Sequence, residues 1–483
     1  MTIEQLATGS SLTGLIVDGV AGTPYAAGTL RIDETTGPLL EVPYIRGDPT
    51  GQFDPVHEWF STRTPPTNLI LRTSEGDVSL FDVSWFGHSE RSGRSVSLGK
   101  LRPSEIVLDT RKADLSAPLM IAEVRSQMDG LREWTEFSAI AEERTTDEHN
   151  YIRGFHIDVS SEASLEWLQG DARMTLQTDW RAATSHVRGE PSVGVFEWVV
   201  LDSAFNSPVP FLTHLVEHQK IKHLLVLMFD GAIHFRQHRV KDESFAKRHG
   251  RMSELHLPFV ELISRRTIHE YAASEPDARA ARMPLVYLDQ IGAEGLTKWS
   301  DRYEAWERFI LPTVGVLGRQ DVFVEDLVVS LSMSVEAAGH LIGVAEGEVE
   351  TYGRNRKPST ATHIYRCLRA VDVAWGDHVE SILGLARASA DVYNSIKHFD
   401  RGQLPDHEEM LLISLVLRHL IRLTALNVID STGQLILQAD GQRELSAIHA
   451  RFSVIERRVR HDGRWEQLPV RAEKPLPKGF TTW

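Results

Sequence analysis

The chain has 483 residues, of which 42% are hydrophobic and 25% are charged, and its formal net charge is −15. The composition is that of an ordinary soluble globular protein, and the length exceeds what one hydrophobic core supports, so we expect two large domains. The negative charge argues against broad non-specific binding of nucleic acid, but it leaves room for a local basic site.

The cysteine content and the apolar runs set further bounds. Cys367 is the only cysteine, which excludes a disulfide or a cysteine-based zinc site within one chain. No run approaches the roughly 18 apolar residues of a membrane span, and the N-terminus lacks the pattern of a signal peptide. We therefore expect a cytoplasmic protein that is not bound to a membrane.

The N-terminal part of the chain is predicted to form short strands separated by turns rich in glycine, proline and threonine. This spacing favours a β-sandwich or a barrel-like domain. The predicted strands are residues 15–20, 29–33, 39–45, 68–73, 77–87, 95–101, 105–110, 119–124, 155–159, 173–178 and 194–200.

Residues 210–283 have a mixed pattern. We predict a helix at residues 211–221, then two strands, residues 224–229 and 232–240, joined by a hairpin turn at Asp230-Gly231. His214 and His218 have the spacing of metal ligands on a helix, but no third ligand is apparent, so a surface helix is favoured. The polar, alanine-rich segment 272–283 is a candidate linker.

From Trp299 onward the apolar residues repeat with a helical period, and the polar breaks between segments fit an antiparallel bundle. The expected fold class is therefore α+β. A β-rich, sandwich-like or barrel-like domain would span residues 1–280, and an all-α helical domain would follow over residues 281–483.

The segment Arg387 to Leu404 is predicted to be an amphipathic helix with one polar stripe. Arg387, Asp391, Asn394 and His398 fall within roughly 60° of one another at 100° per residue. The opposite side is apolar and contains Leu385, Ala388, Val392, Ile396 and Phe399. Because Gly402 and Pro405 stop the helix, we expect His398 to lie in its last full turns.

Several segments together resemble the ApeA-type abortive-infection proteins, which pair an N-terminal β-domain with a C-terminal HEPN helical domain. The resemblance rests on the β-rich N-terminal half and the helical C-terminal half, and on three segments: LREWTEF around Trp134, EAAGH (Glu336 to His340) and YNSIKHFD (Tyr393 to Asp400). It implies an anti-phage protein whose HEPN domain forms a homodimer and cleaves RNA without a metal or other cofactor.

The resemblance also implies where the catalytic residues lie. HEPN ribonucleases carry arginine, four to six residues and then histidine, often as Arg-Asn, three residues and His. Asn394 and His398 match this motif, but Tyr393 stands where arginine is expected. Arg387 or Lys397 would therefore have to supply the missing positive charge.

On this hypothesis each polar residue has a role in RNA cleavage. His398 transfers a proton near neutral pH, Arg387 and Lys397 hold phosphate, and Asn394 fixes the imidazole or a phosphate oxygen. Asp391 orients Arg387 from one turn away. The expected partners are RNA and a phage-derived trigger.

Two alternatives remain open. An arginine followed by four to six residues and a histidine occurs six times in the chain, about as often as chance predicts, so spacing alone identifies no nuclease. Among these pairs, Arg443 and His449 also lie on a predicted helix. The other alternative is a non-catalytic HEPN interaction module, in which the missing arginine marks lost activity and the β-domain binds a protein partner.

Overall fold

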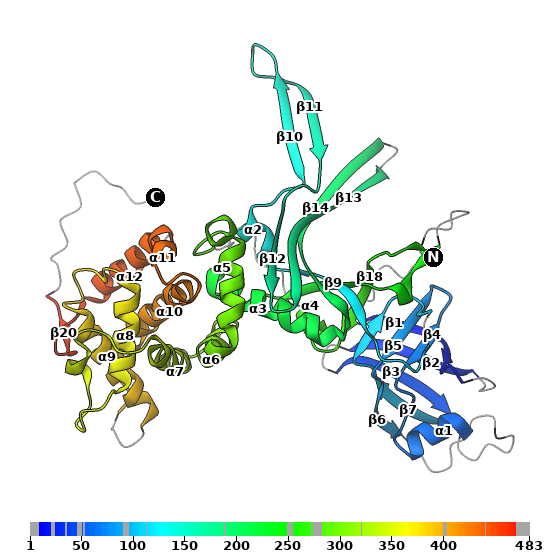
Figure 1. The fold of residues 1–483 in the computed structure, drawn as a ribbon, viewed down its shortest axis with the longest axis horizontal. Coiled ribbons are helices and arrows are strands. Elements are labelled where there is room, and N and C mark those ends of the chain that lie inside the picture. The colour runs from blue at the N-terminus through cyan, green and yellow to red at the C-terminus, as the bar shows by residue number, and fades with distance from the viewer. Residues whose placement is uncertain are drawn as a thin grey trace, which may run out of the picture. The chain divides into compact units, whose positions relative to one another are not determined.

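The computed structural model describes residues 9–469, except for 21–24, 34–35, 46–50, 52–53, 90–95, 113, 188–189, 249–254, 272, 274–282, 320, 399–402 and 440. The chain divides into two compact units (Figure 1). The sheet unit comprises Met1–Lys222 and Ile233–Arg282, and the helical unit comprises His223–Ala232 and Met283–Trp483. The candidate linker, residues 272–283, lies mostly outside the described residues. The sequence pattern did not predict that residues 223–232 belong to the helical unit.

The sheet unit is built on a 14-stranded sheet whose strands pair antiparallel in the order β12-β13-β14-β9-β15-β18-β8-β5-β4-β1-β2-β3-β7-β6. In chain order these strands are β1 (Ser11–Val17), β2 (Ala26–Asp33), β3 (Gly37–Tyr44), β4 (Leu69–Arg72), β5 (Asp77–Phe81), β6 (Ser84–Ser89), β7 (Ser97–Arg102), β8 (Glu105–Val107), β9 (Ile121–Met128), β12 (Ser164–Gln169), β13 (Ala172–Val187), β14 (Glu190–Val209), β15 (Phe235–Lys241) and β18 (Val260–Ser264).

Each predicted strand up to residue 200 overlaps an observed strand, with one difference at residues 77–87. This segment forms two strands, β5 and β6, because Asp82 adopts a left-handed backbone conformation (φ 49°) that interrupts the extended chain. The Asp82 carboxylate accepts a hydrogen bond from the Ser104 hydroxyl at 2.7 Å, which holds the break in place.

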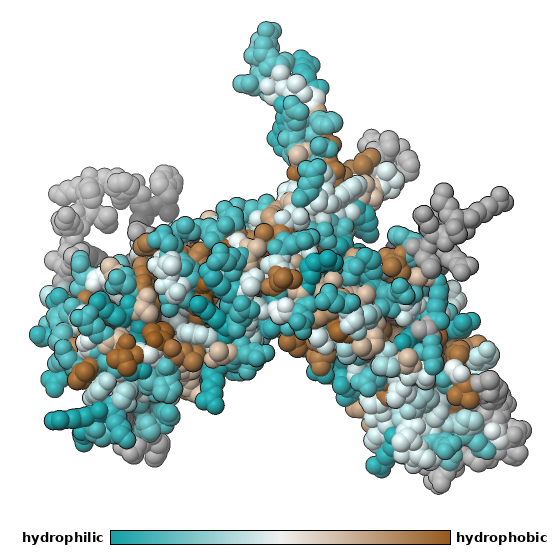
Figure 2. Space-filling model, viewed as in Figure 1, coloured by the Kyte–Doolittle hydropathy of each residue, from teal (hydrophilic) through white to brown (hydrophobic). Residues whose placement is uncertain are grey.

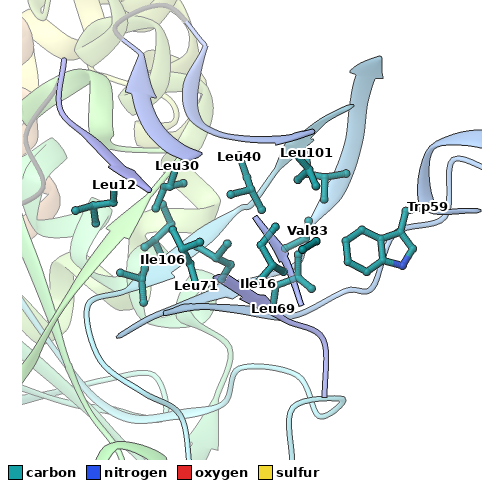
Figure 3. Packing of buried hydrophobic residues seen from close by; sticks show 14 of the residues in the cluster. Leu12, Ile16, Leu30, Leu40, Trp59, Leu69, Leu71, Val83, Leu101 and Ile106 are labelled. Carbon is teal, nitrogen blue, oxygen red and sulfur yellow. The ribbon is translucent and has the colours of Figure 1, made fainter. Parts of the chain in front are cut away.

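The core of the first half of the sheet is made by the inward-facing residues of its strands and by α1 (Asp54–Ser61). Figure 3 shows Leu30, Leu40, Leu71 and Ile106 grouped in this core. Phe60 of α1 lies over Gly99 of β7, where a Cβ atom would collide with the phenyl ring. Glycine at this position therefore lets α1 pack against the sheet.

The second half of the sheet carries α3 (Phe211–Phe229) and two long hairpins. One hairpin is formed by β13 and β14, and the other, β10 (Ile140–Thr146) with β11 (Ile152–Val159), pairs outside the main sheet (Figure 1). The remaining elements of the unit are α2 (Leu131–Thr135), η1 (Glu243–Phe245), β16 (Lys247–Arg248), β17 (Leu255–His256) and α4 (Ile268–Tyr271).

The predicted hairpin at Asp230-Gly231 is wrong, because residues 224–229 form the end of α3. Six consecutive apolar residues have no period of their own, so the pattern does not separate a buried strand from a buried helix. The helix ends at Phe229, since Asp230 adopts a left-handed conformation (φ 52°), and the next strand, β15, begins at Phe235.

The helical unit consists mainly of α-helices, and the expected fold class, a β-rich domain followed by a helical one, is confirmed. Its elements are α5 (Leu288–Tyr303), η2 (Glu304–Trp306), α6 (Glu307–Leu317), α7 (Val324–Ile342), η3 (Glu348–Thr351), α8 (Thr360–Val371), α9 (Ile382–Lys397), α10 (His407–Ile429), α11 (Gln434–Gln438), α12 (Gly441–Ile455), β19 (Arg457–Val459) and β20 (Trp465–Gln467).

The central helix of this unit is α10. It is the one helix among the described residues that is long and apolar enough to cross a membrane, although Arg418, His419 and Arg422 interrupt its apolar run. However, 83% of its most apolar window is buried among the other helices, as expected for a core helix. Arg422 of α10 donates hydrogen bonds to the carbonyl oxygens of Leu227 (2.7 Å) and Met228 (2.6 Å), which binds the end of α3 into the helical unit.

Candidate functional site

Helix α9 carries the polar stripe that the sequence predicts. The helix begins after Ser381, whose hydroxyl accepts a hydrogen bond from the Gly384 amide at 3.1 Å, as an N-cap residue does. Leu385, Ala388 and Val392 are buried. Asp391 is exposed, and Arg387 and Asn394 are partly exposed, so the stripe lies on the solvent side of the helix.

His398 lies just beyond the helix, which corrects the prediction that it occupies the last full turns. Helix α9 ends at Lys397, and the backbone of His398 is extended (φ −109°, ψ 102°). Its amide still donates to the Asn394 carbonyl oxygen at 3.0 Å. A periodic pattern defines helix ends poorly, because the last turn has no further intrahelical donors. Phe399 lies outside the described residues.

Arg387 makes contacts that join α9 to two neighbouring segments. Its guanidinium donates to the Glu350 carbonyl oxygen at 2.6 Å and to the His461 carbonyl oxygen at 3.3 Å. Glu350 lies in η3, and His461 lies in the turn between β19 and β20. The charge of Arg387 is therefore engaged in holding the fold around α9.

Lys397 is exposed and is positioned by Tyr393, the residue at the position where the HEPN resemblance predicts arginine. Its ammonium group donates to the Tyr393 hydroxyl at 3.1 Å and lies 5.1 Å from the centroid of the ring. The hydrogen bond to Tyr393 raises the pKa of Lys397, and Glu336 of α7 adds to this shift. The lysine therefore carries a positive charge at the end of α9.

Glu336 belongs to a group of polar residues on α7 and α8 that spacing within α9 does not reveal. The Thr360 hydroxyl donates to the Glu336 carboxylate at 3.1 Å. One turn further along α7, the ring of His340 lies edge-on to that of His363, with 5.0 Å between the centroids. The four-residue spacing within EAAGH was the one sequence signal for this group, since Glu336 and His340 share a helix face.

The alternative pair, Arg443 and His449, lies on α12. Arg443 is exposed, and its Nη1 atom is 3.6 Å from the sulfur of Met283. The His449 ring packs so closely against Gly376 that a Cβ atom there would be 2.6 Å from the imidazole. This histidine is therefore packed against Gly376 and is only partly exposed.

The prediction of a surface helix for His214 and His218 is wrong, because both side chains are fully buried between α3 and the sheet. The His214 Nε2 atom is 3.1 Å from the Ile121 carbonyl oxygen, which only accepts, so this nitrogen carries the proton. Its Nδ1 atom then accepts from the Ser203 hydroxyl at 2.8 Å.

The same direction of donation continues through the buried chain. The Ser203 oxygen accepts from His218 Nε2 (2.8 Å), and His218 Nδ1 accepts from the Ser126 hydroxyl (2.6 Å). The Ser126 oxygen accepts from His238 Nδ1 (2.6 Å), and His238 Nε2 accepts from the Thr267 hydroxyl (3.0 Å). We call these six side chains, from His214 to Thr267, the histidine chain.

Every ring nitrogen of the histidine chain is used in a hydrogen bond, so none is left to bind a metal. Burial lowers the pKa of His214 to about 4 and that of His238 to about 3, and it holds the pKa of His218 well below the usual value. Across the described part of the chain, no group of three or more histidine, cysteine, aspartate or glutamate residues is arranged to hold a metal ion.

Comparison with known proteins identifies the N-terminal part of the chain. Residues 21–299, more than half of the chain, match the family described as ApeA N-terminal domain 1. No curated protein and no solved structure matches the chain. The match covers most of the sheet unit and extends into α5, whereas the HEPN assignment of the later helices stays a prediction. The chain belongs to the ApeA family.

Proposed function

We propose that the protein defends cells against phage and that its helical unit acts as a HEPN-type endoribonuclease during infection. Membership of the ApeA family supports the role in abortive infection. The observation that carries the catalytic part is the end of α9, where Lys397, held by Tyr393, and His398 are adjacent and exposed. These residues bring a cation and a proton-transfer group to one site.

The proposed reaction is attack of an RNA 2′-oxygen on the neighbouring phosphorus. His398 exchanges the proton, and Lys397 stabilises the negative charge that develops on the phosphorane oxygens. Asn394 donates a hydrogen bond to phosphate, and Asp391 orients the polar groups of the stripe. We assign the missing positive charge to Lys397, because the guanidinium of Arg387 already donates to two carbonyl groups.

The proposed assembly is a homodimer through the helical unit, in which two copies of the stripe face one another across a two-fold interface. The sheet unit would recognise a phage-derived trigger or restrain the nuclease. Its hairpin β10–β11 supports a recognition role, since Tyr151 and Phe155 are 67% and 52% exposed there. Figure 2 shows this hairpin as mostly hydrophilic with hydrophobic patches. Exposed aromatic side chains of this kind are common in protein interfaces.

A second candidate function is a non-catalytic HEPN module that binds a protein partner. Tyr393 in the arginine position favours it, because the typical motif is then incomplete. In this case the α9 stripe would contact a partner chain, and the protein would act in defence without cutting RNA itself.

Infection of cells that produce wild-type protein, His398→Ala or His269→Ala separates the two functions. His269 is an exposed histidine on α4 of the sheet unit and serves as the control. We expect wild type and His269→Ala to protect cells and to generate new RNA ends during infection, and His398→Ala to do neither. Full protection by His398→Ala, with no RNA ends that depend on the protein, would rule out the nuclease.

A further inference from the structure

Three helices of the helical unit meet around one set of reactive side chains. Helix α7 packs against both α8 and α9 (Figure 1). The approach of α7 to α8 depends on Gly339, where a Cβ atom would collide with the carbonyl oxygen of His363. This close crossing sets the His340 ring of α7 beside the His363 ring of α8.

The two histidines differ in burial. His363 is 9% exposed, and its Nδ1 atom is buried with no hydrogen-bond partner. Burial and the nearby Arg366 lower the pKa of His363, so this ring is neutral. His340 is exposed and meets solvent. The buried His363 ring therefore packs edge-on against the exposed His340 ring and limits its movement.

The carboxylate of Glu336 links this histidine pair to the end of α9. Its hydrogen bond from Thr360 holds it at the start of α8, and it interacts electrostatically with both Lys397 and His363. Glu336 and His340 lie one turn apart on the same face of α7. A carboxylate, an imidazole and the Lys397 ammonium group therefore share one surface, and His398 adjoins it in the chain.

We propose that His340 is a second proton-transfer residue of the ribonuclease site, with His363 as its positioning residue. This inference rests on the proposed function and completes its chemistry, since cleavage of RNA needs one group to take a proton and another to give one. An arginine or lysine side chain keeps its proton in neutral water, whereas an imidazole can take a proton or give one there, so a second imidazole supplies the group that the cations cannot.

The reaction balances with two histidines. One imidazole takes the proton from the 2′-hydroxyl, the 2′-oxygen bonds to phosphorus, and the bond from phosphorus to the 5′-oxygen breaks. The second imidazole, in its protonated form, gives a proton to the departing 5′-oxygen. The products are a 2′,3′-cyclic phosphate and a 5′-hydroxyl end, and no oxidant or reductant takes part.

The test uses lysates of phage-infected cells that contain the full-length protein, so that any trigger is present. The substrate is a short RNA with one labelled end, and a copy with 2′-deoxynucleotides reports cleavage that does not use the 2′-oxygen. We expect wild type to show a bell-shaped dependence of rate on pH. His340→Ala is expected to cleave about 10²-fold more slowly and to lose one limb of that profile, as general acid–base residues typically do.

Three further measurements distinguish a loss of proton transfer from a loss of folding. His340 is exposed, so His340→Ala should keep the circular dichroism spectrum and melting temperature of wild type. Imidazole added to the buffer should restore part of its activity, since a solvent-facing gap admits a small base. The His269→Ala control should match wild type throughout.

The experiment distinguishes the absence of nuclease activity from the absence of a role for His340. If wild-type lysate cleaves the RNA no faster than lysate without the protein, the nuclease itself is excluded, and His340 has no such role. If wild type cleaves, His398→Ala does not, and His340→Ala keeps the wild-type rate and pH profile, the nuclease stands and the second histidine is overturned.

Discussion

Arg387 and Lys397 are both cations of α9, but their contacts give them different roles. Arg387 donates to carbonyl oxygens in η3 and in the β19–β20 turn, whereas Lys397 contacts Tyr393 of its own helix. We expect Arg387→Met to lower the free energy of unfolding on the order of 1 kcal/mol, because two carbonyl groups lose a charged donor. Lys397→Met should leave stability nearly unchanged and reduce RNA cleavage.

Thermal melts measure the stability of the Arg387→Met and Lys397→Met variants. RNA cleavage rates, normalised to the folded fraction, measure their activity. Lys397→Arg serves as the control, since it keeps the positive charge and should keep most of the activity. The assignment of the missing charge to Lys397 fails if Arg387→Met keeps its melting temperature and loses cleavage, while Lys397→Met cleaves normally.

The sequence predicted the solvent side of α9 but not what its residues contact. The spacing of Tyr393 and Lys397 is a local helix relation and was open to prediction. The partners of Arg387 lie 37 and 74 residues away, and the link from Lys397 to Glu336 joins two helices. Periodicity assigns a residue to a face, but only the packed helices determine which partner it meets.

At the scale of elements, η3 is fixed to α8 by a buried ion pair. The Arg366 guanidinium donates to both carboxylate oxygens of Glu348, at 2.7 and 2.8 Å, and the exposed fractions of the two residues are 5% and 1%. Glu348 also accepts from the Ala345 amide and the Tyr352 hydroxyl, each at 2.8 Å. The Glu348 carboxylate is thus surrounded by hydrogen-bond donors, which stabilise its ionised form.

We expect Arg366→Met to destabilise the helical unit by about 3–5 kcal/mol, because it leaves the Glu348 charge buried without its cation. The double variant Arg366→Met/Glu348→Leu should recover much of that loss, since it removes both charges. Arg369→Met is the control, because its ion pair with Asp372 is long (3.9 Å) and largely exposed. Urea unfolding followed by circular dichroism measures all three, and equal losses for Arg366→Met and Arg369→Met would contradict the argument.

Two elements show why sequence patterns failed at this scale. Residues 224–229 have no period, and only their burial within the helical unit makes them the end of α3. The single break at Asp82 divides one predicted strand into β5 and β6. In contrast, β2 and β7 alternate clearly in burial, because one face of each meets the core and the other is more exposed.

At the scale of the whole molecule, the stability of each unit depends on the protonation state of different side chains. The histidine chain of the sheet unit requires neutral imidazoles, since each ring both donates and accepts. In the helical unit, hydrogen bonding to Arg366 lowers the pKa of Glu348 to about 2. Glu444, although partly buried, has its pKa lowered to about 2 by His419 and Arg422. The units should therefore respond to acid in different ranges of pH.

The direction of each effect follows from the folded and unfolded pKa values. A histidine with a lowered pKa binds its proton more readily when unfolded, so its stabilisation is lost as pH falls below about 6.5, towards about 4 for His214 and about 3 for His238. Glu348 and Glu444 stabilise the fold above about 4.5, and their contribution is lost only between about 4.5 and 2.

Glu105 of the sheet unit opposes the histidines, because burial raises its pKa to about 7 and its contribution grows as pH falls from about 7 to 4.5. Burial also raises the pKa of Asp202 and Glu261 in the same unit, which adds to the opposing effect. The lowering of the pKa is large for all three histidines, so they outweigh these carboxyl groups. We therefore expect the sheet unit to lose stability between about pH 6.5 and 4.5 while the helical unit changes less, as hydrogen exchange of peptides from each unit would show.

Substitution of His218 makes this prediction specific. His218→Gln keeps one donor and one acceptor in the middle of the chain but takes up no proton, so the slope of sheet-unit stability against pH should fall by about 1.4 kcal/mol per pH unit. Glu105→Gln should steepen that slope, because it removes the opposing group. If His218→Gln and wild type keep the same slope across this range, the histidine chain does not set the acid sensitivity of the sheet unit.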